Sequence, residues 1–247
     1  TPFDLRTQPP LRVALVRRAD DHVLLFTVHH IAWDDESWRV LFDDLAAAYA
    51  GRSLTPPPVA VADLPESDPG RVAADLAYWR DRLTPPPAPL DLPAAGRRVD
   101  GRAADGLVSA PVPAETRTAA ADLARSLQTT PFAVTAAATM AFLHRAFGAD
   151  DLLLAVPTTT RPAGARDLIG YFGNTMLLRG TMTGRTAFGE LVSATAERLA
   201  AGLAASSAPI DQVVAGLDPD RSGGDGLSAL VSASLSVRGG LDGLRLD

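Results

Sequence analysis

The chain of 247 residues contains neither cysteine nor lysine. Without cysteine it can form no disulfide and use no thiolate, which fits a reducing compartment. Without lysine it can carry no Walker A phosphate loop, no Schiff base and no lysine nucleophile. GxSxG and GxGxxG motifs are also absent from the sequence. Several common enzyme classes are therefore excluded before any other feature is considered.

Basic charge and long apolar runs are equally scarce. The formal net charge is -6 and no block of arginines occurs, so the sequence offers no basic surface for nucleic acid. No apolar run approaches the ~18 residues that a membrane span needs, and no charged-then-apolar leader opens the chain. We therefore expect a soluble, cytoplasmic protein that binds neither nucleic acid nor membrane.

The most informative stretch, residues 23–45, reads VLLFTVHHIAWDDESWRVLFDDL. Its apolar beginning predicts a strand that is buried on both faces. Because side chains alternate along a strand, His29 and His30 should point to opposite sides of the sheet. Asp34 and Asp35 then fall at the start of a helix, where acidic side chains cap free N–H groups and suit the helix dipole.

Three interpretations of the adjacent histidines are open. In the first, each is a hydrogen-bonded core residue without chemistry. In the second they bind a metal, but adjacent strand residues diverge, and His22 and His144 are the only other histidines. The sequence therefore disfavours a metal site. In the third, one imidazole is a general base or hydrogen-bond partner, and a buried aspartate holds the local geometry.

Three ordered motifs resemble those of one known family. Residues 2–5 and 10–12 read PFDL and PLR, residues 29–35 read HHIAWDD, and residues 169–175 read IGYFGNT, with LR after them. They are similar to the PFDL…PLLR, HHxxxDG and IGxFxNTxxLR motifs of condensation domains from nonribosomal peptide synthetases. That superfamily resembles chloramphenicol acetyltransferase. The departure is Asp35, which stands where the family has glycine.

The resemblance implies that His29, His30 and Asp34 form the catalytic motif. His30 would accept or orient the proton of an acceptor amine as the amine attacks a donor thioester. His29 would be structural, and Asp34 would form a salt bridge with an arginine. We expect that arginine to be Arg161, because it lies in the TRP stretch before IGYFGNT.

The resemblance also implies the partners and the substrate contacts. Both substrates would ride on the phosphopantetheine arms of a donor and an acceptor carrier domain, and no cofactor or metal would bind directly. Candidate substrate-binding residues are Trp33, Asp35, Arg161 and Asn174. Asn174 would shape the channel through hydrogen bonds, although an asparagine in a turn is an ordinary structural feature.

Several relatives of the condensation domain remain as alternatives. Asp35 and the SWR sequence at residues 37–39 are reminiscent of epimerization domains and of a subgroup that dehydrates a tethered serine. A third relative, the X-type domain, recruits an oxygenase and usually lacks the second histidine, which is intact here as His30. A module that only docks carrier domains would keep the fold without the chemistry.

Helical and strand patterns alternate without repeats, which predicts an α/β fold with a largely mixed sheet. The resemblance implies two acetyltransferase-like lobes, incomplete at both ends. Residues 1–98 would be the rest of the N-terminal lobe with a proline-rich linker, and residues 99–247 part of the C-terminal lobe. We expect strands at about residues 11–17, 23–30, 107–112, 151–156, 175–181 and 227–237, and helices at about residues 37–50, 73–83, 114–127, 132–147, 188–205 and 209–217.

Overall fold

The computed structural model describes residues 2–57, 59–92, 106–217 and 226–237. These residues form two compact units. The first unit contains the chain up to residue 66 together with residues 159–173. The second contains residues 67–158 and continues from residue 174. The domain boundary expected at residue 98 lies outside the described residues and stays a prediction.

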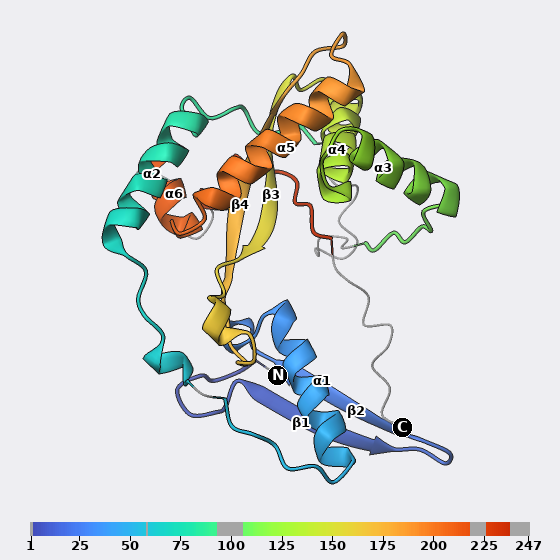
Figure 1. Cartoon of the computed structure of the whole chain (residues 1–247), viewed down its shortest axis with the longest axis vertical. Helices are drawn as coiled ribbons and strands as arrows, with labels where there is room; N and C mark the ends of the chain where they lie inside the picture. The colour runs from blue at the N-terminus through green and yellow to red at the C-terminus, as the bar shows by residue number, and fades with distance from the viewer. Residues whose placement is uncertain (1, 58, 93–105, 218–225, 238–247) are drawn as a thin grey trace, which may run out of the picture. The chain divides into compact units, whose positions relative to one another are not determined.

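The first unit is built on an antiparallel hairpin with one long helix against it (Figure 1). Phe26 of the hairpin contacts the rings of Trp38 and Phe42 on that helix, at centroid distances of 6.3 and 6.4 Å. The predicted hairpin and helix are therefore confirmed. The elements are β1 (Leu11–Arg17), β2 (His22–Val28), the short 3₁₀ helices η1 (His30–Ala32), η2 (Val61–Asp63) and η3 (Ala163–Ala165), and α1 (Asp35–Tyr49).

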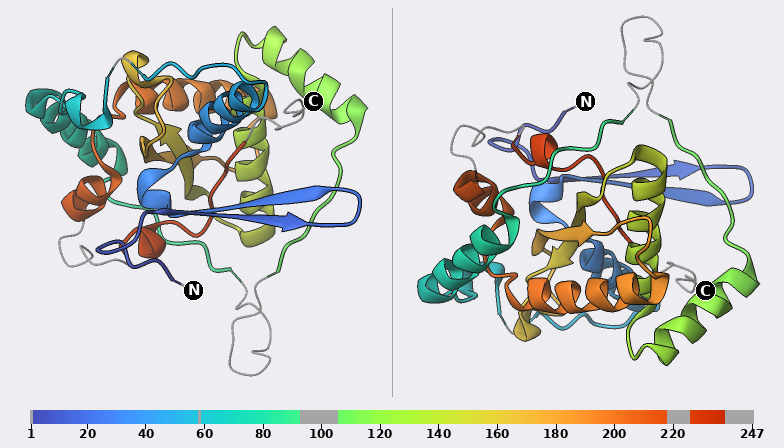
Figure 2. Two further views of the ribbon diagram at one scale, coloured as in Figure 1. Left: turned by 90° about the horizontal axis from the view of Figure 1, so that it is seen from below. Right: turned by 90° about the horizontal axis from the view of Figure 1, so that it is seen from above.

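The expectation that β2 is buried on both faces is wrong for the described structure. Leu24 and Leu25 are 37% and 50% exposed, and Leu15 on β1 is 55% exposed. Figure 2 shows why: β1 and β2 form a long two-stranded ribbon, and no other strand of the described residues pairs with it. An apolar sequence signals burial but does not provide the layers that bury it.

The second unit packs helices on a second antiparallel pair of strands. Main-chain bonds from Met182 N to Asp150 O (2.8 Å) and from Thr160 N to Phe172 O (2.7 Å) mark the two ends of that pair and make it antiparallel. The strands are β3 (Asp151–Thr159) and β4 (Gly173–Thr181), and the helices are α2 (Pro69–Leu83), α3 (Ala114–Ser126), α4 (Pro131–Phe147), α5 (Phe188–Ala204), α6 (Ile210–Leu217) and α7 (Gly226–Leu230).

Helices α4 and α5 lie against β4 in the second unit (Figure 1). The sulfur of Met140 on α4 comes so close to Gly180 that a Cβ there would stand 2.2 Å from it. The sulfur of Met176 approaches Gly202 on α5 almost as closely, at 2.3 Å from an added Cβ. Both helices thus approach positions 176 and 180, which share one face of the strand. Two glycines make this close packing possible.

Two predicted strands are corrected. Residues 107–112 form no strand, and Leu107 and Val108 are 95% and 92% exposed. Residues 226–230 form helix α7, and from the rest of the predicted strand 227–237 only Ser234 makes a bridge, parallel to Ala155 of β3. Strand propensity alone did not decide either segment, because a strand needs a partner with free hydrogen-bonding groups.

The fold class predicted from sequence is confirmed. Helices alternate with antiparallel strand pairs and one parallel bridge, which is an α/β arrangement with mixed pairing. In the part of the chain that is described, no helix is both long and apolar enough to span a membrane.

Candidate functional site

The histidine motif follows strand β2 in the first unit, but the histidines themselves are not strand residues. β2 ends at Val28, His29 caps the 3₁₀ helix η1, and His30 is the first residue of η1. The expected alternation of two strand side chains is therefore wrong. The chain leaves the strand because Ala32 N bonds to His29 O (3.1 Å) and Trp33 N bonds to His30 O (3.3 Å), which tightens the backbone into a turn.

The two imidazoles nevertheless have different surroundings. His29 packs edge-on against Phe3, with ring centroids 5.8 Å apart, whereas His30 packs edge-on against Tyr171 at 5.1 Å. His29 Nδ1 accepts a hydrogen bond from Ile31 N (3.1 Å). His30 Nδ1 lies 2.5 Å from the carbonyl oxygen of Trp33. Each ring is thus held by a short local hydrogen bond.

In the neutral form of each ring, these hydrogen bonds set opposite tautomers. A carbonyl oxygen can only accept, so His30 Nδ1 must carry its proton and its Nε2 keeps a lone pair. A backbone N–H can only donate, so His29 Nδ1 is the unprotonated nitrogen and its Nε2 carries the proton. Of the pair, only His30 therefore offers Nε2 as a proton acceptor.

Asp34 is the N-cap of α1 and forms a buried ion pair with Arg161. Its Oδ1 accepts from Ser37 N (3.0 Å), and the two side chains complete a capping box. Arg161 Nη2 donates to Oδ1 at 2.6 Å and Oδ2 at 2.8 Å. The predicted pairing of Asp34 with Arg161 is confirmed. The Asp34 and Arg161 side chains are only 10% and 7% exposed.

The surroundings of Asp34 act on its pKa in opposite directions. Burial disfavours the carboxylate and raises the pKa. Hydrogen bonds from Ser37 and Arg161, together with the charge of Arg161, favour the carboxylate more strongly. The net effect holds the pKa of Asp34 below its ordinary value, so that this buried carboxyl is ionised at neutral pH.

The ion pair also ties α1 to the IGYFGNT segment. Phe172 N donates to Asp34 Oδ2 (3.1 Å), and Gly170 N donates to Ser37 Oγ (3.1 Å). The guanidinium of Arg161 lies 4.2 Å from the ring centre of Phe172. Two motifs that are more than a hundred residues apart in sequence thus meet in one polar network.

The first unit also contains Trp33 and Asp35, two of the substrate-binding candidates. Trp33 is 6% exposed and its ring packs against Trp38 at 4.9 Å. Asp35 is the first residue of α1. The N-cap of this helix, a role expected of both aspartates, is Asp34 alone. The backbone of Asp35 is helical, so the site does not need the glycine that the family has there. Substrate contacts by either residue stay a prediction.

Arg161 and Asn174 are both engaged with protein groups. Besides Asp34, Arg161 Nη1 donates to Ala165 O (2.7 Å) and Leu168 O (2.6 Å). Asn174 belongs to the second unit, where its Nδ2 donates to Ser206 O and Ala208 O, at 3.0 and 2.9 Å. Asn174 Oδ1 accepts from the main-chain N–H groups of residues 175 and 210. Their contact with substrate stays a prediction.

Sequence reasoning missed Ser37, Tyr171 and Gly173. Ser37 had a signal, because the spacing Asp34-x-x-Ser37 is that of a capping box with serine in the third helical position. Tyr171 and Gly173 occupy the variable positions of IGxFxNT, so nothing in the motif pointed to them. Only the folded chain shows Tyr171 beside His30.

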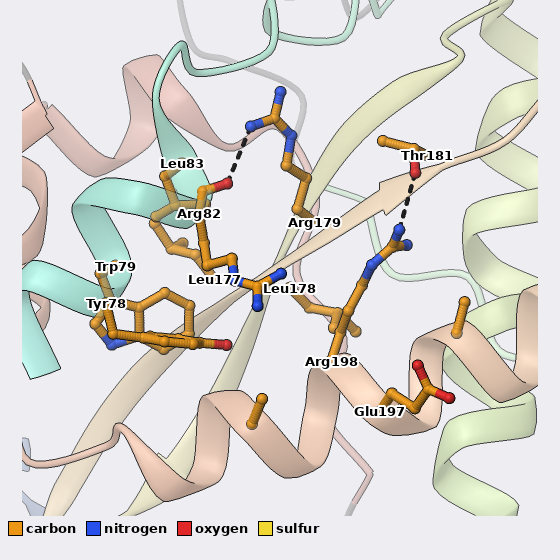
Figure 3. A pocket seen from close by; sticks show the side chains of 12 residues that line it. Tyr78, Trp79, Arg82, Leu83, Leu177, Leu178, Arg179, Thr181, Glu197 and Arg198 are labelled. Atoms are coloured by element: carbon orange, nitrogen blue, oxygen red, sulfur yellow. Dashed lines mark hydrogen bonds between the residues drawn. The ribbon is translucent and has the colours of Figure 1, made fainter.

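A cavity of about 450 Å³ lies in the second unit, between α2, β4 and α5 (Figure 3). Arg82, Arg179 and Arg198 line it together with aromatic and aliphatic side chains. Arg179 donates to the carbonyl of Arg82 (3.0 Å), and Arg198 to Thr181 Oγ1 (2.9 Å). Leu178 and Arg179, the LR that follows IGYFGNT, line this cavity. None of the candidate catalytic and substrate-binding residues lines it, and the chemistry is therefore sought at His30.

Metal binding has no support in the described ranges, where no three histidine or carboxylate side chains come together as a possible ligand set. In these ranges, the histidine that lies nearest a carboxylate is His144, which contacts residues that follow its own helix. His144 Nδ1 lies 3.1 Å from Asp150 Oδ1 and 3.2 Å from Ala149 O, just after the end of α4.

Comparison with known proteins agrees with the motifs. The sequence profile of the condensation domain matches residues 1–237. The isonitrile lipopeptide synthase of Mycobacterium tuberculosis is 36% identical over 241 residues, covering 89% of this chain and 10% of that protein.

Two solved structures show the same fold. The first condensation domain of the calcium-dependent antibiotic synthetase, in complex with a substrate analogue, has a TM-score of 0.69 and 26% identity, over 92% of this chain and 51% of that one. The X-domain from teicoplanin biosynthesis has a TM-score of 0.72 and 27% identity, over 87% and 52%. The chain thus spans about half the length of these domains.

Proposed function

Because the chain belongs to the condensation-domain family, we propose that it forms an amide bond between two groups held as thioesters on carrier domains of a nonribosomal peptide synthetase. The observation that carries the proposal is the hydrogen bond between His30 Nδ1 and Trp33 O. It leaves Nε2 of His30, an exposed residue, as a proton acceptor, which acid–base chemistry requires.

The proposed reaction is aminolysis of a thioester. The nitrogen of the acceptor amine attacks the donor carbonyl carbon, a C–N bond forms, and the C–S bond breaks. His30 Nε2 takes one proton from the attacking amine and returns it to the departing sulfur, so the ring is neutral again at the end. General-base assistance is typically worth ~10²–10⁴ in rate, so positioning of the two thioesters must supply much of the rest.

Asp34 and Arg161 support this chemistry without taking part in it. Their side chains are buried, and Asp34 is fully used by Arg161, Ser37 and the N–H of Phe172. The aspartate begins α1 immediately after the histidine turn, so the ion pair holds the backbone from which His30 projects. The proposed role of both residues is to keep that turn in place.

The proposed partners are a donor and an acceptor carrier domain, each presenting its substrate on a phosphopantetheine arm. The isonitrile lipopeptide synthase that matches this chain is a large synthetase, and one structural neighbour is a four-domain nonribosomal peptide synthetase. The substrate-binding roles of Trp33, Asp35, Arg161 and Asn174 belong to the same proposal, as does the division into an N-terminal and a C-terminal lobe.

The X-domain is the alternative that the fold alone does not separate, because its TM-score is as high as that of the condensation domain. The state of His30 favours the catalytic reading. The residue is exposed, and the bond of Nδ1 to Trp33 O leaves Nε2 to accept a proton. A domain that only recruits partners has no need of that arrangement.

The test is intact-protein mass spectrometry on the synthetase that contains this chain, with its own carrier domains loaded with donor and acceptor. Wild type is compared with His30→Ala, and with His22→Ala as a control, since His22 is an exposed residue at the start of β2. Transfer of the donor mass to the acceptor carrier in wild type and His22→Ala, but not in His30→Ala, is expected. Loss of one water from a single carrier would indicate the dehydrating subgroup instead. Bound carriers without any mass change would overturn the enzymatic proposal.

A further inference from the structure

Tyr171 lies between two residues whose backbone is bonded to the start of α1. Gly170 N donates to Ser37 Oγ at 3.1 Å, and Phe172 N donates to Asp34 Oδ2 at 3.1 Å. Phe172 is 9% exposed, whereas Tyr171 is 49% exposed. Since neighbouring side chains diverge where a chain runs into a strand, burial of Phe172 turns Tyr171 outward. The network around Asp34 therefore determines where Tyr171 is presented.

The side chain of Tyr171 meets the ring of His30. Their ring centroids are 5.1 Å apart and their planes make an angle of 86°, an edge-to-face contact in the favourable range. His30 is thus restrained at two points: Nδ1 by Trp33 O, and the ring by Tyr171. A hydrogen bond at one nitrogen still allows the ring to tilt about it, and the aromatic contact limits that tilt.

Gly173 makes the position of the Tyr171 ring possible. A Cβ at residue 173 would stand 2.8 Å from Tyr171 Cε2 and 3.0 Å from both Cζ and the hydroxyl oxygen. Real Cβ atoms essentially never come within 3.0 Å of a neighbour, so any side chain there would displace the ring. The ring lies in the space that glycine leaves free. Both residues occupy positions that the IGxFxNT pattern leaves open, so this combination is a property of the present chain.

We propose that Tyr171, lying over Gly173, is a positioning residue that holds the His30 imidazole in the orientation from which Nε2 meets the acceptor amine. The assignment rests on the proposed function. Tyr171 acts through His30 and takes no proton itself. Because its side chain is half exposed, it adds little to the interior of the first unit, and its loss affects the orientation of His30 more than the stability of the fold.

The test is a double-mutant cycle in the complete synthetase, with Tyr171→Ala, Gly173→Ala and the double variant. Each single variant is expected to lower kcat of amide formation about 3- to 10-fold with KM for the loaded carriers unchanged, the factor that corresponds to one aromatic contact. In the Tyr171→Ala background, Gly173→Ala should cost nothing further, because the displaced ring is already gone. Tyr171→Phe keeps the ring and should restore the rate that Tyr171→Ala loses.

A matched control and a spectroscopic readout accompany the cycle. Gly164→Ala serves as the control, because a Cβ at that glycine of η3 would meet nothing within 4 Å. The ring-proton NMR shifts of His30 report the tyrosine ring current, and should change in Tyr171→Ala and Gly173→Ala but not in Gly164→Ala.

Two outcomes separate the assignment from the function it rests on. Independent, additive effects of the two single variants in an active synthetase, or unchanged His30 resonances, would overturn the role of Tyr171 alone. A wild-type synthetase that forms no amide would overturn the proposed function and the assignment together.

Discussion

The two compact units of this chain have interiors of different chemistry. In the first unit, a buried ion pair, Asp34 with Arg161, and the fully buried Ser37 hold α1 to the segment before β4. The buried apolar cluster beside them consists of Ala165, Leu168 and Phe172. The second unit contains a far larger apolar core, formed by α2, α3, α4, α5, α6, β3 and β4.

The polar interior of the first unit is suited to positioning side chains, and the apolar core of the second unit is suited to stabilising the fold. Hydrogen bonds and ion pairs are directional, so they place a backbone segment with accuracy, but leaving one partner unpaired in the interior is costly. Apolar contacts are non-directional and scale with buried area, so a large core stabilises without specifying single atoms. The unit that carries the histidine motif is the one that relies on directional bonds.

Removal of the His30 imidazole should produce the largest functional change. His30→Ala is expected to slow amide formation ~10²–10⁴-fold while both interiors stay intact, because His30 is exposed and belongs to neither. Single-turnover mass spectrometry measures the rate, and circular dichroism checks the fold. A variant with nearly wild-type rate would show that substrate positioning alone drives the reaction.

Removal of the buried guanidinium should destabilise the first unit. Arg161→Met leaves Asp34 charged and unpaired, and is expected to cost about 3–5 kcal/mol. Fluorotryptophan resonances distinguish the units during urea unfolding, since Trp33 and Trp38 belong to the first and Trp79 to the second.

Arg179→Met is the matched control for Arg161→Met. Arg179 also pairs with an aspartate, Asp151, but these side chains are 24% and 36% exposed, so water replaces the lost partner more easily. The Arg179 variant should therefore lose less stability than the Arg161 variant. Equal losses in the two variants would mean that burial does not set the difference between the two ion pairs.

Creation of a cavity should affect the second unit instead. Leu154 of β3 is completely buried, and Leu154→Ala is expected to cost about 2–5 kcal/mol, seen at the Trp79 resonance. Leu203→Ala is the control, because Leu203 is 53% exposed on α5. If the urea midpoint measured at Trp33 and Trp38 decreased as much as the midpoint measured at Trp79, the two units would unfold as one.

A smaller effect is expected where the second unit does use directional bonds. Asn174→Ala removes the acceptor for Ile210 N and the donor to Ser206 O and Ala208 O. The loss should be about 1–3 kcal/mol, because groups at the start of α6 lose their partners. Hydrogen exchange of the Ile210 amide should accelerate, while exchange in the interior of α5 stays unchanged. Unchanged protection of Ile210 would show that these bonds are dispensable.

Acid should weaken the first unit through Asp34. Its pKa is lower in the folded than in the unfolded chain, whose value is near ~3.9, so the unfolded state takes up the proton first as pH falls. The stabilisation is complete above the unfolded pKa and is lost as pH falls through the folded one. The urea concentration at the midpoint of unfolding, measured at Trp33 and Trp38, should therefore decrease when the pH is lowered below about 4. The urea midpoint should change less with pH in Asp34→Asn than in wild type. The same change with pH in both would assign the effect to other carboxylates.

The sequence was informative wherever a local pattern has a local cause. Helices α1 to α6 were found near their observed bounds because apolar spacing and N-terminal caps reside in the same few residues, as at Asp34 and α1. The pairing of Asp34 with Arg161 was also predicted, from the family resemblance and from the place of Arg161 in the TRP stretch before IGYFGNT. The strands at residues 107–112 and 227–237 were wrong because strand formation depends on a partner elsewhere in the chain.

The sequence by itself thus determined the family, helices α1 to α6 and the group that can act as base. The tertiary structure decided the rest. The histidines lie in a turn instead of a strand, their opposite tautomers follow from bonds to Trp33 O and Ile31 N, and Tyr171 reaches His30 over Gly173. The physical reason is that a lone pair is made available by its neighbours in space, and residues 30 and 171 become neighbours only when the chain has folded.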